Sequence, residues 1–321
     1  MSLKRMNRRE VLSFGAALAS AAAASTQLGA TPDESSKPEW ARTIENIINA
    51  KGDFSNGVLS IDLDRDDIGT IMLNPPIPGS MSVPVKPAFQ VNGTLTFQQI
   101  AGRVMSNSDM ALKPSEIDPF ISALIRHEII FQAEHQHFYD FSPMVWFVHF
   151  RQMGSPEQVA ENIKAALNVT STPFPQAPPP NPHTPLPVQD IAAIIGVPAK
   201  IDDDGVVHFS VPRANPIFLG GVQISPFLNV QTMIDFEPLN ANGTLAAAVP
   251  DFGMVASEIN PVVGLMRSFE WDSGCLYNQE TDEQPQLYFD HFFKAGNPID
   301  LARQIRAALN LMNVAVAGRV R

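Results

Sequence analysis

The sequence has a single cysteine, Cys275, among its 321 residues, which excludes an intramolecular disulfide. Stability must therefore come from the burial of apolar side chains. The sequence also lacks a glycine-rich phosphate loop, a G-x-S-x-G motif and a paired-cysteine metal motif, so none of these familiar site signatures is present. Basic residues are outnumbered by acidic ones, 22 to 33, and the net charge is −11. This excess of negative charge argues against nucleic acid or anionic lipid as the main partner.

The first 26 residues have the pattern of an export signal. Four basic residues precede a run of small apolar residues, Val11–Ala24, which contains an A-x-A cleavage site at its end. Arg8-Arg9 resembles a twin-arginine signal. The alternative, an N-terminal anchor helix, is disfavoured because the run is short and rich in alanine. We expect residues 1–26 to be removed, leaving a periplasmic or secreted protein with no transmembrane segment and a net charge near −14, because the signal carries +3.

The rest of the chain contains an internal repeat. Residues 115–168 and 257–310 align without a gap at an offset of 142, and about 18 of the 54 positions are identical. Between the copies lies a proline-rich stretch with eight prolines in residues 173–187, which is typical of a polyproline-type linker. The sequence therefore predicts a first repeat at 39–170, a linker at 171–188 and a second repeat at 189–321.

The periodicities predict an α+β fold in which each repeat has strands followed by a strand–helix–hairpin–helix unit. The first helix is expected to begin at Pro119 in one copy and at Pro261 in the other, because each proline follows a good N-cap residue. Segments 128–138 and 144–152 are β-prone and flank a short connection, which predicts a hairpin. We expect the repeats to pack through two equivalent apolar sheets.

Three histidines of the first copy are candidate metal ligands. His135 and His137 are two apart and share a strand face, and the hairpin brings His149 opposite them. Neutral imidazoles suit zinc, copper or iron, and three of them leave a position for water or substrate. By parity, Glu128 and Glu134 point to the opposite face. A register shifted by one residue would separate His149 from the others, so structural histidines remain an alternative.

The second copy differs at these positions. His149 recurs as His291, whereas the other two histidines are replaced by Tyr277 and Gln279. Tyrosine and glutamine form hydrogen bonds with ligands but are poor ligands for a soft divalent metal. Tyr277, Gln279 and His291 therefore predict a degenerate second site or a polar pocket for another ligand. Cys275 is expected to be a small buried apolar residue and not a nucleophile.

Several motifs resemble the LppY/LpqO family, which is named after mycobacterial lipoproteins and classed as a domain of unknown function. The first copy has A-E-H-Q-H at 133–137 for the family's A-L-H-N-H, and 143–150 resembles P-R-L-F-F-M-H-F. The second copy has D-F-G-M at 251–254, S-E-I-N-P-V at 257–262 and R-A-A-L at 306–309. The chain lacks the family's lipid-attachment cysteine and the second H-N-H. The resemblance implies a two-repeat exported protein and supplies no activity.

Three functions are consistent with the sequence. The leading one is an exported protein that binds a divalent metal or a small ligand at the first-repeat histidines. The second is a metal-dependent hydrolase of a small envelope substrate, in which a metal-bound water attacks the substrate. The third is a non-catalytic envelope interaction protein with structural histidines. The sequence does not choose between enzyme and binding protein, and it leaves the oligomeric state open.

Overall fold

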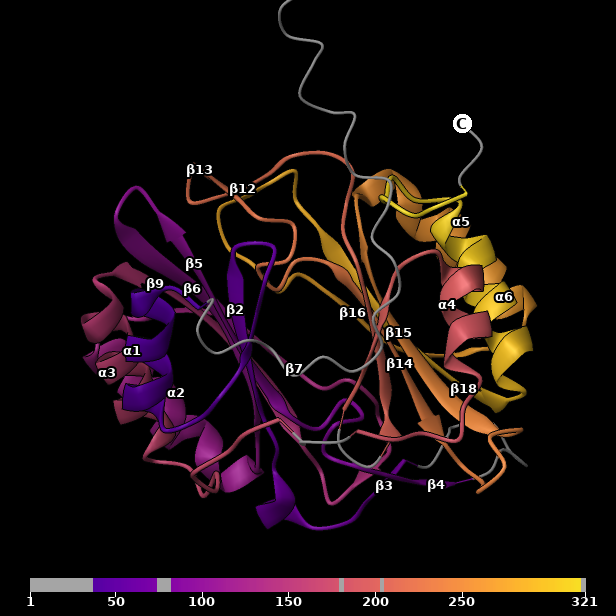
Figure 1. Ribbon diagram of the computed structural model, residues 1–321, viewed down its shortest axis with the longest axis horizontal. Helices are drawn as coiled ribbons and strands as arrows, with labels where there is room; N and C mark the ends of the chain where they lie inside the picture. The colour runs from indigo at the N-terminus through magenta and orange to yellow at the C-terminus, as the bar shows by residue number, and fades with distance from the viewer. Residues whose placement is uncertain (1–36, 74–81, 179–181, 203–204, 319–321) are drawn as a thin grey trace, which may run out of the picture. The chain divides into compact units, whose positions relative to one another are not determined.

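In the described part of the chain, each repeat builds one six-stranded antiparallel sheet with three helices on one face (Figure 1). The computed structural model describes residues 37–73, 82–178, 182–202 and 205–318, and the expected signal peptide lies outside them. The described residues belong to one compact unit. The predicted α+β class and the two similar halves are therefore confirmed.

The two large sheets have the same strand order. In the first, neighbouring strands are β1 (Asp53–Ser55), β2 (Val58–Leu63), β5 (Gly93–Ile100), β6 (Arg103–Leu112), β9 (Trp146–Gly154) and β7 (Ile130–His135). In the second they are β10 (Ala199–Ile201), β11 (Val207–Val211), β14 (Thr232–Pro238), β15 (Ala246–Met254), β18 (Tyr288–Gly296) and β16 (Asp272–Tyr277).

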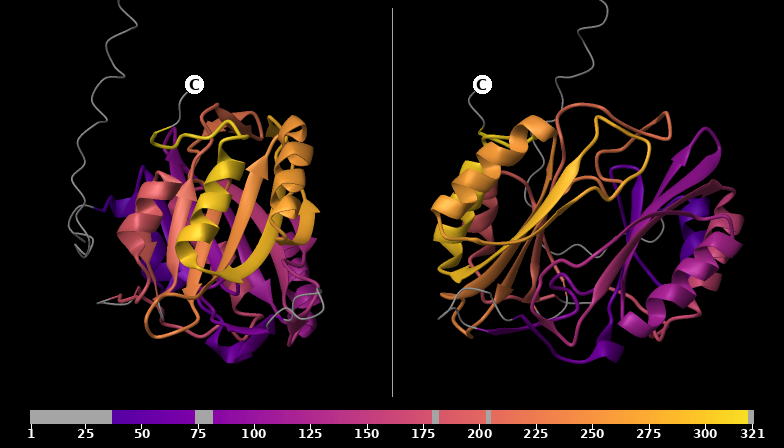
Figure 2. Two further views of the ribbon diagram at one scale, coloured as in Figure 1. Left: turned by 90° about the vertical axis from the view of Figure 1, so that its right-hand side faces the viewer. Right: turned by 180° about the vertical axis from the view of Figure 1, so that it is seen from behind.

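The helices cover the outer face of each sheet, so the sheets face each other with helices on both outer sides (Figures 1 and 2). The first sheet carries α1 (Glu39–Ile48), α2 (Ile117–Arg126) and α3 (Pro156–Leu167), and the second carries α4 (Val188–Ile195), α5 (Ala256–Ser268) and α6 (Pro298–Leu309). In α3, Val159 and Ile163 are fully buried against the sheet, four residues apart as helical periodicity requires. Among the described residues, no helix is long and apolar enough to cross a membrane.

The caps of α3 and α6 are those that the sequence indicates. Ser155 Oγ accepts a hydrogen bond from the backbone N–H of Gln158 at 3.2 Å, and Asn297 Oδ1 accepts one from Ile299 at 3.0 Å. The proline that follows each cap occupies the first helical position, where an N–H has no helical partner.

The predicted starts of the other two helices are wrong. α2 begins at Ile117 and α5 at Ala256, upstream of Pro119 and Pro261. In α5 the start is set by Glu258, whose Oε2 accepts a hydrogen bond from the backbone N–H of Val255 at 2.9 Å. A carboxylate in the first turn satisfies a free N–H and interacts favourably with the helix dipole. Pro261 consequently lies inside the helix.

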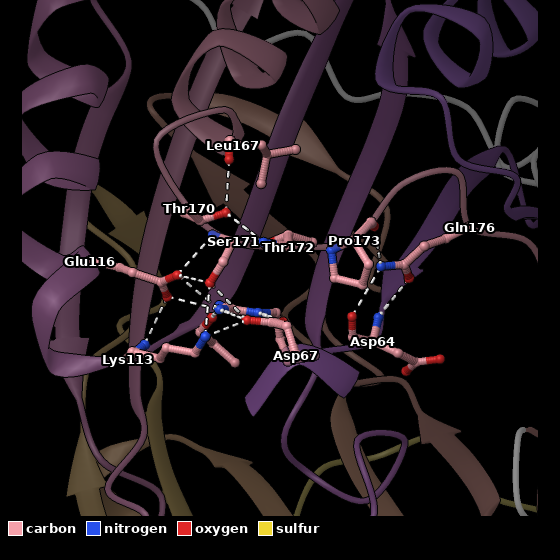
Figure 3. Close-up of polar contacts among 12 residues, drawn as sticks. Asp64, Asp67, Lys113, Glu116, Leu167, Thr170, Ser171, Thr172, Pro173 and Gln176 are labelled. Atoms are coloured by element: carbon pink, nitrogen blue, oxygen red, sulfur yellow. Dashed lines mark hydrogen bonds and ion pairs between the residues drawn. The ribbon is translucent and has the colours of Figure 1, made fainter. Parts of the chain in front are cut away.

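Buried ion pairs explain the recurrence of the Ser-Glu-Ile motif. Glu116 accepts a hydrogen bond from Arg65 Nη2 at 2.8 Å and another from the backbone N–H of Ser171 at 2.8 Å (Figure 3). In the second repeat, Glu258 pairs with Arg213 Nη1 at 2.8 Å. Both guanidinium groups are almost fully buried. The recurring glutamate therefore serves the scaffold of each repeat.

The described part of the linker that follows the first repeat packs against that repeat. The Gln176 side chain accepts a hydrogen bond from the backbone N–H of Asp64 at 2.7 Å and donates one to its carbonyl at 3.0 Å (Figure 3). Phe174 packs against the first core, with the Lys164 ammonium 3.3 Å from its ring centroid.

Apolar contact between the two halves is concentrated in two clusters that contain small sheets. The small sheet of β4 (Val83–Val85), β3 (Ile71–Leu73) and β8 (Phe141–Ser142) packs in one cluster with Ala247 and Val249 of the other repeat. The sheet of β13 (Val222–Ile224), β12 (Ile217–Leu219) and β17 (Glu283–Gln284) packs reciprocally with Val58 and Met105. The expected apolar meeting of the sheets is present in these clusters, whereas other facing residues are polar and enclose a cavity.

Candidate functional site

A cavity of about 510 Å³ lies between the two sheets and has walls from both repeats. Strands β1, β2, β5, β6 and β9 supply the first wall, and β10, β11, β14, β15, β16 and β18 supply the second. Its lining is rich in carboxylate, imidazole, amide and hydroxyl groups. Because these strands belong to different repeats, the cavity exists only when the repeats are packed together.

Two equivalent Asp–His pairs face this cavity. Asp109 on β6 lies directly opposite His149 on β9, and Asp251 on β15 lies directly opposite His291 on β18. Directly opposed residues of antiparallel strands share a face, and all four side chains line the cavity. In the second pair, His291 Nε2 is 3.6 Å from Asp251 Oδ2.

The three histidines predicted as a metal site in the first repeat lie beside the residues predicted as a second site in the second repeat. His135 Nε2 and His149 Nε2 are 2.9 Å apart, and the ring of Tyr277 stacks on His135 with 3.6 Å between centroids. The rings of His137 and His291 stack at 3.9 Å. The two sets of residues therefore form one cluster at the interface of the repeats.

Strand pairing accounts for the first three histidines. His135 is paired with Phe147, and Ala133 with His149, with an irregularity in the register after Phe131. His137 follows the end of β7. His137 and His149 line the cavity together with Gln279, whereas His135 does not.

Burial keeps the imidazoles neutral. Desolvation lowers the pKa of His135 to about 3, and it lowers the pKa values of His137, His149 and His291 well below the usual range. A neutral imidazole has one donor and one acceptor nitrogen, so the contact between His135 and His149 is an N–H···N hydrogen bond.

The two aspartates opposite these histidines are also perturbed by burial. Desolvation raises the pKa of Asp109 to about 7, although Asn229 Nδ2 donates a hydrogen bond to its Oδ1 at 3.0 Å. The pKa of Asp251 is raised well above its usual value by burial and by the charges of Asp290 and Asp109. Asp109 thus contributes to the raised pKa of Asp251, and both carboxyl groups face one cavity.

Other carboxylates that line the cavity are compensated by a lysine. Lys200 Nζ is 2.9 Å from Asp53 Oδ2 and 3.0 Å from Asp62 Oδ2. Burial alone would raise the pKa of Asp62, but the charges of Lys200 and His208 and the hydrogen bonds from Lys200 and Thr94 together outweigh it and lower the pKa. The Lys200 side chain is 40% exposed, so this part of the cavity is closer to solvent than His291, which is 1% exposed.

Cys275 lies beside the histidine cluster. Its Sγ is 3.5 Å from His291 Nδ1 and 3.8 Å from His135 Nδ1. Burial raises the pKa of its thiol well above the usual value, which keeps the sulfur protonated. Glu128 and Glu270, the recurring carboxylates, are exposed and adopt positive φ angles of 56° and 62°, so their position reflects a turn after a helix.

Sequence reasoning missed Asp109, Asp251 and Lys200. A signal for the two aspartates exists, because they are 142 residues apart, the offset of the repeat, and Asp109 lies six positions before the aligned block at Ser115. Lys200 gave no such signal, since its ion pair with Asp62 joins residues 138 positions apart.

The described residues contain no group of three or more His, Cys, Asp or Glu side chains arranged to hold a metal ion. Two nitrogen ligands of tetrahedral zinc lie roughly 3.3 Å apart, so the 2.9 Å contact between His135 and His149 is too short to span an ion. Three buried atoms of this region nevertheless have no hydrogen-bond partner among the described residues: His137 Nδ1, His149 Nδ1 and Asp251 Oδ1.

Fold and site together define a class of protein: a duplicated α+β unit whose two copies enclose a polar cavity. A family model described as Domain of Unknown Function (DUF1259) matches the chain twice, over residues 42–169 and 189–311. These matches cover more than half of the sequence, and the chain belongs to this family. No curated protein and no solved structure matches it.

Proposed function

We propose that the protein binds a small polar molecule in the cavity between its repeats. The observation that carries this proposal is the cavity itself, with a volume of about 510 Å³ and a wall of polar side chains from both repeats. Sites for small molecules typically occupy roughly 300–1,000 Å³ and present a few convergent polar groups.

The unpartnered atoms of the cavity wall support a ligand that forms hydrogen bonds. His137 Nδ1, His149 Nδ1 and Asp251 Oδ1 are buried without a partner among the described residues. Each unsatisfied buried polar group costs about 1–3 kcal/mol. A bound molecule that pairs with even one of these atoms regains part of that free energy, which favours polar ligands over hydrocarbons.

A cavity-blocking variant tests the proposal. Ser210 lines the cavity, and Ser210→Phe would fill part of it. Ser268→Phe, at an exposed position of α5, is the matched control. Saturation-transfer NMR with a mixture of small amines, polyols and carboxylates should give signals with wild type and Ser268→Phe that are lost with Ser210→Phe. The same signals from a folded Ser210→Phe protein would contradict binding in the cavity.

A divalent metal is the second candidate ligand, and the specific observation in its favour is the concentration of imidazoles. His135, His137 and His149 would hold zinc, copper or iron, the metals that neutral imidazoles suit. A metal-activated water would then make the protein a hydrolase, with His291 at the edge of the same cluster.

Metal content decides on this second candidate. His135→Tyr/His137→Gln gives the first repeat the residues that the second has at the matching positions, Tyr277 and Gln279. Protein purified without a His-tag should contain about one equivalent of a transition metal in the wild type and none in this variant. Wild-type protein free of transition metal would contradict the candidate.

Export is part of the proposed function. The signal-like residues 1–26 and the motifs resembling the LppY/LpqO family support a periplasmic or secreted protein. Fractionation of cells that express the full chain should place it outside the cytoplasm, and Arg8→Lys/Arg9→Lys should retain it inside. An unchanged distribution of this variant would contradict the twin-arginine route.

A further inference from the structure

Five aspartates line the cavity, and one of them, Asp235, pairs with His208 at 2.6 Å. The other four fall into two groups that differ in one respect. Asp53 and Asp62 share the ammonium group of Lys200, at 2.9 and 3.0 Å. Asp109 and Asp251 form no ion pair with any lysine or arginine of the described residues, and the imidazole 3.6 Å from Asp251, that of His291, is neutral. One group therefore has a cation, and the other does not.

We propose that the ligand carries a positively charged ammonium group and that this group binds between Asp109 and Asp251. The inference rests on the proposed binding of a small molecule in the cavity and specifies the chemical class of that molecule. A ligand ammonium would supply the positive charge that these two carboxylates lack, as Lys200 supplies it to Asp53 and Asp62.

Charge and hydrogen bonding favour this class. Asp109 Oδ1 accepts a hydrogen bond from Asn229 Nδ2 at 3.0 Å, whereas Asp251 Oδ1 accepts none from the described residues. A buried carboxylate without a cation is costly, and an ammonium group offers three N–H donors as well as the compensating charge. An anionic ligand would add a like charge to a region that already contains two acidic groups.

The neighbouring rings favour an organic cation further. Tyr277 and Phe227 line the same cavity as the two aspartates. Aromatic faces attract a cation, and the attraction is stronger where the cation is desolvated. The site is less suitable for a metal ion. Such an ion requires several ligand atoms at about 2.0–2.2 Å from it, and the described side chains have no such arrangement. An ammonium group accepts longer and less regular hydrogen bonds.

Three four-carbon probes with different end groups test the inference. Isothermal titration calorimetry at pH 8 would compare 1,4-diaminobutane, 1,4-butanediol and succinate, with zinc chloride as the inorganic cation. The wild type should bind the diamine in preference to the other three. Asp109→Asn/Asp251→Asn should weaken this binding at least tenfold. Asp190→Asn/Asp300→Asn removes the same charge from exposed positions and should leave it unchanged.

The outcomes separate this inference from the proposal on which it rests. Binding of butanediol or succinate that Ser210→Phe abolishes, without binding of the diamine, would overturn the ammonium site and leave a small-molecule cavity. Binding of zinc alone would overturn it in favour of a metal. Diamine binding that is equal in the wild type and in Asp109→Asn/Asp251→Asn would also overturn it, and so would no binding of any probe.

Discussion

The two repeats have the same strand order and the same buried Arg–Glu pair, yet they present different residues to the cavity. Asp109 and His149 recur as Asp251 and His291, whereas His137 is matched by Gln279. The scaffold is thus duplicated together with one Asp–His pair per copy, and the other cavity residues differ. Duplication here leads to one site with two unlike walls.

The largest effect is expected from breaking the scaffold that the repeats share. Arg65→Met should lower the free energy of unfolding by about 3–5 kcal/mol, because it leaves Glu116 without its buried partner. Arg213→Met should do the same for Glu258. Urea unfolding followed by circular dichroism measures both.

An ion pair at the surface provides the control for these two arginine variants. Arg303, whose side chain is 67% exposed, pairs with Asp300, and Arg303→Met should change the stability by less than about 1 kcal/mol. A loss of similar size at Arg303 and at Arg65 would refute the special role of the buried pairs.

The second prediction contrasts the two kinds of cavity carboxylate by their pH dependence. An unfolded aspartate has a pKa of about 3.9, whereas burial raises the pKa of Asp109 to about 7. Between these values the folded state holds a proton that the unfolded state has lost. Stability therefore falls as pH rises from about 4 to 7, by at most about 1.4 kcal/mol per pH unit. Asp109→Asn should make this slope shallower by the contribution of one group in urea unfolding at pH 4.5, 6 and 7.5, whereas Asp251 keeps its own raised pKa.

The matched variant Asp62→Asn should act with the opposite sign. Lys200 lowers the pKa of Asp62 in the folded state, so this carboxylate stabilises the fold at neutral pH and loses its contribution as pH falls through the lowered pKa. Asp62→Asn should therefore be less stable than the wild type at pH 7.5. Parallel pH profiles for the two variants would contradict the difference between the two groups of carboxylates.

A smaller loss of stability should follow from removing Lys200, the cation that pairs with Asp53 and Asp62. Lys200→Met leaves Asp53 and Asp62 without their ammonium, and because Lys200 is 40% exposed the loss at pH 7.5 should be only about 1 kcal/mol. The loss should shrink in 1 M salt, which screens exposed charges. A loss independent of salt would show that packing of the side chain, and not its charge, matters here.

The smallest effect concerns a turn that both repeats use in the same way. Glu128 and Glu270 have φ angles of 56° and 62°, which favour glycine. Glu128→Gly and Glu270→Gly should each stabilise the protein by about 0.5–1 kcal/mol, measured as an increase in the thermal midpoint. Glu134→Gly, in strand β7, should instead destabilise it. A decrease in the midpoint for both turn variants would show that their carboxylates have partners in solution.

Much of the fold can be predicted from the sequence because its signals are local or repeated. The helix caps at Ser155 and Asn297 depend on neighbouring residues, and the duplication is visible as a fixed offset. The predicted starts of α2 and α5 are wrong because they rest on the prolines and overlook the carboxylate of the first turn, which in α5 binds the backbone N–H of Val255. The ion pair of Glu116 with Arg65 could not be predicted, because the two residues are 51 positions apart.

The site could be predicted only in part for a related reason. Spacing within one hairpin was enough to select His135, His137 and His149. The cavity, however, depends on which residues of the two repeats face each other, and spacing within one repeat carries no information about that. Asp109 and Asp251 come together only through the packing of two sheets.

The most direct test of a single site built by both repeats is the affinity for 1,4-diaminobutane of two single variants, Asp109→Asn and Asp251→Asn. Each changes one repeat only, and isothermal titration calorimetry at pH 8 measures both beside the wild type. We predict that each variant weakens binding at least tenfold, because the ammonium contacts both walls. Full loss in one variant with unchanged affinity in the other would contradict a site shared by the two repeats.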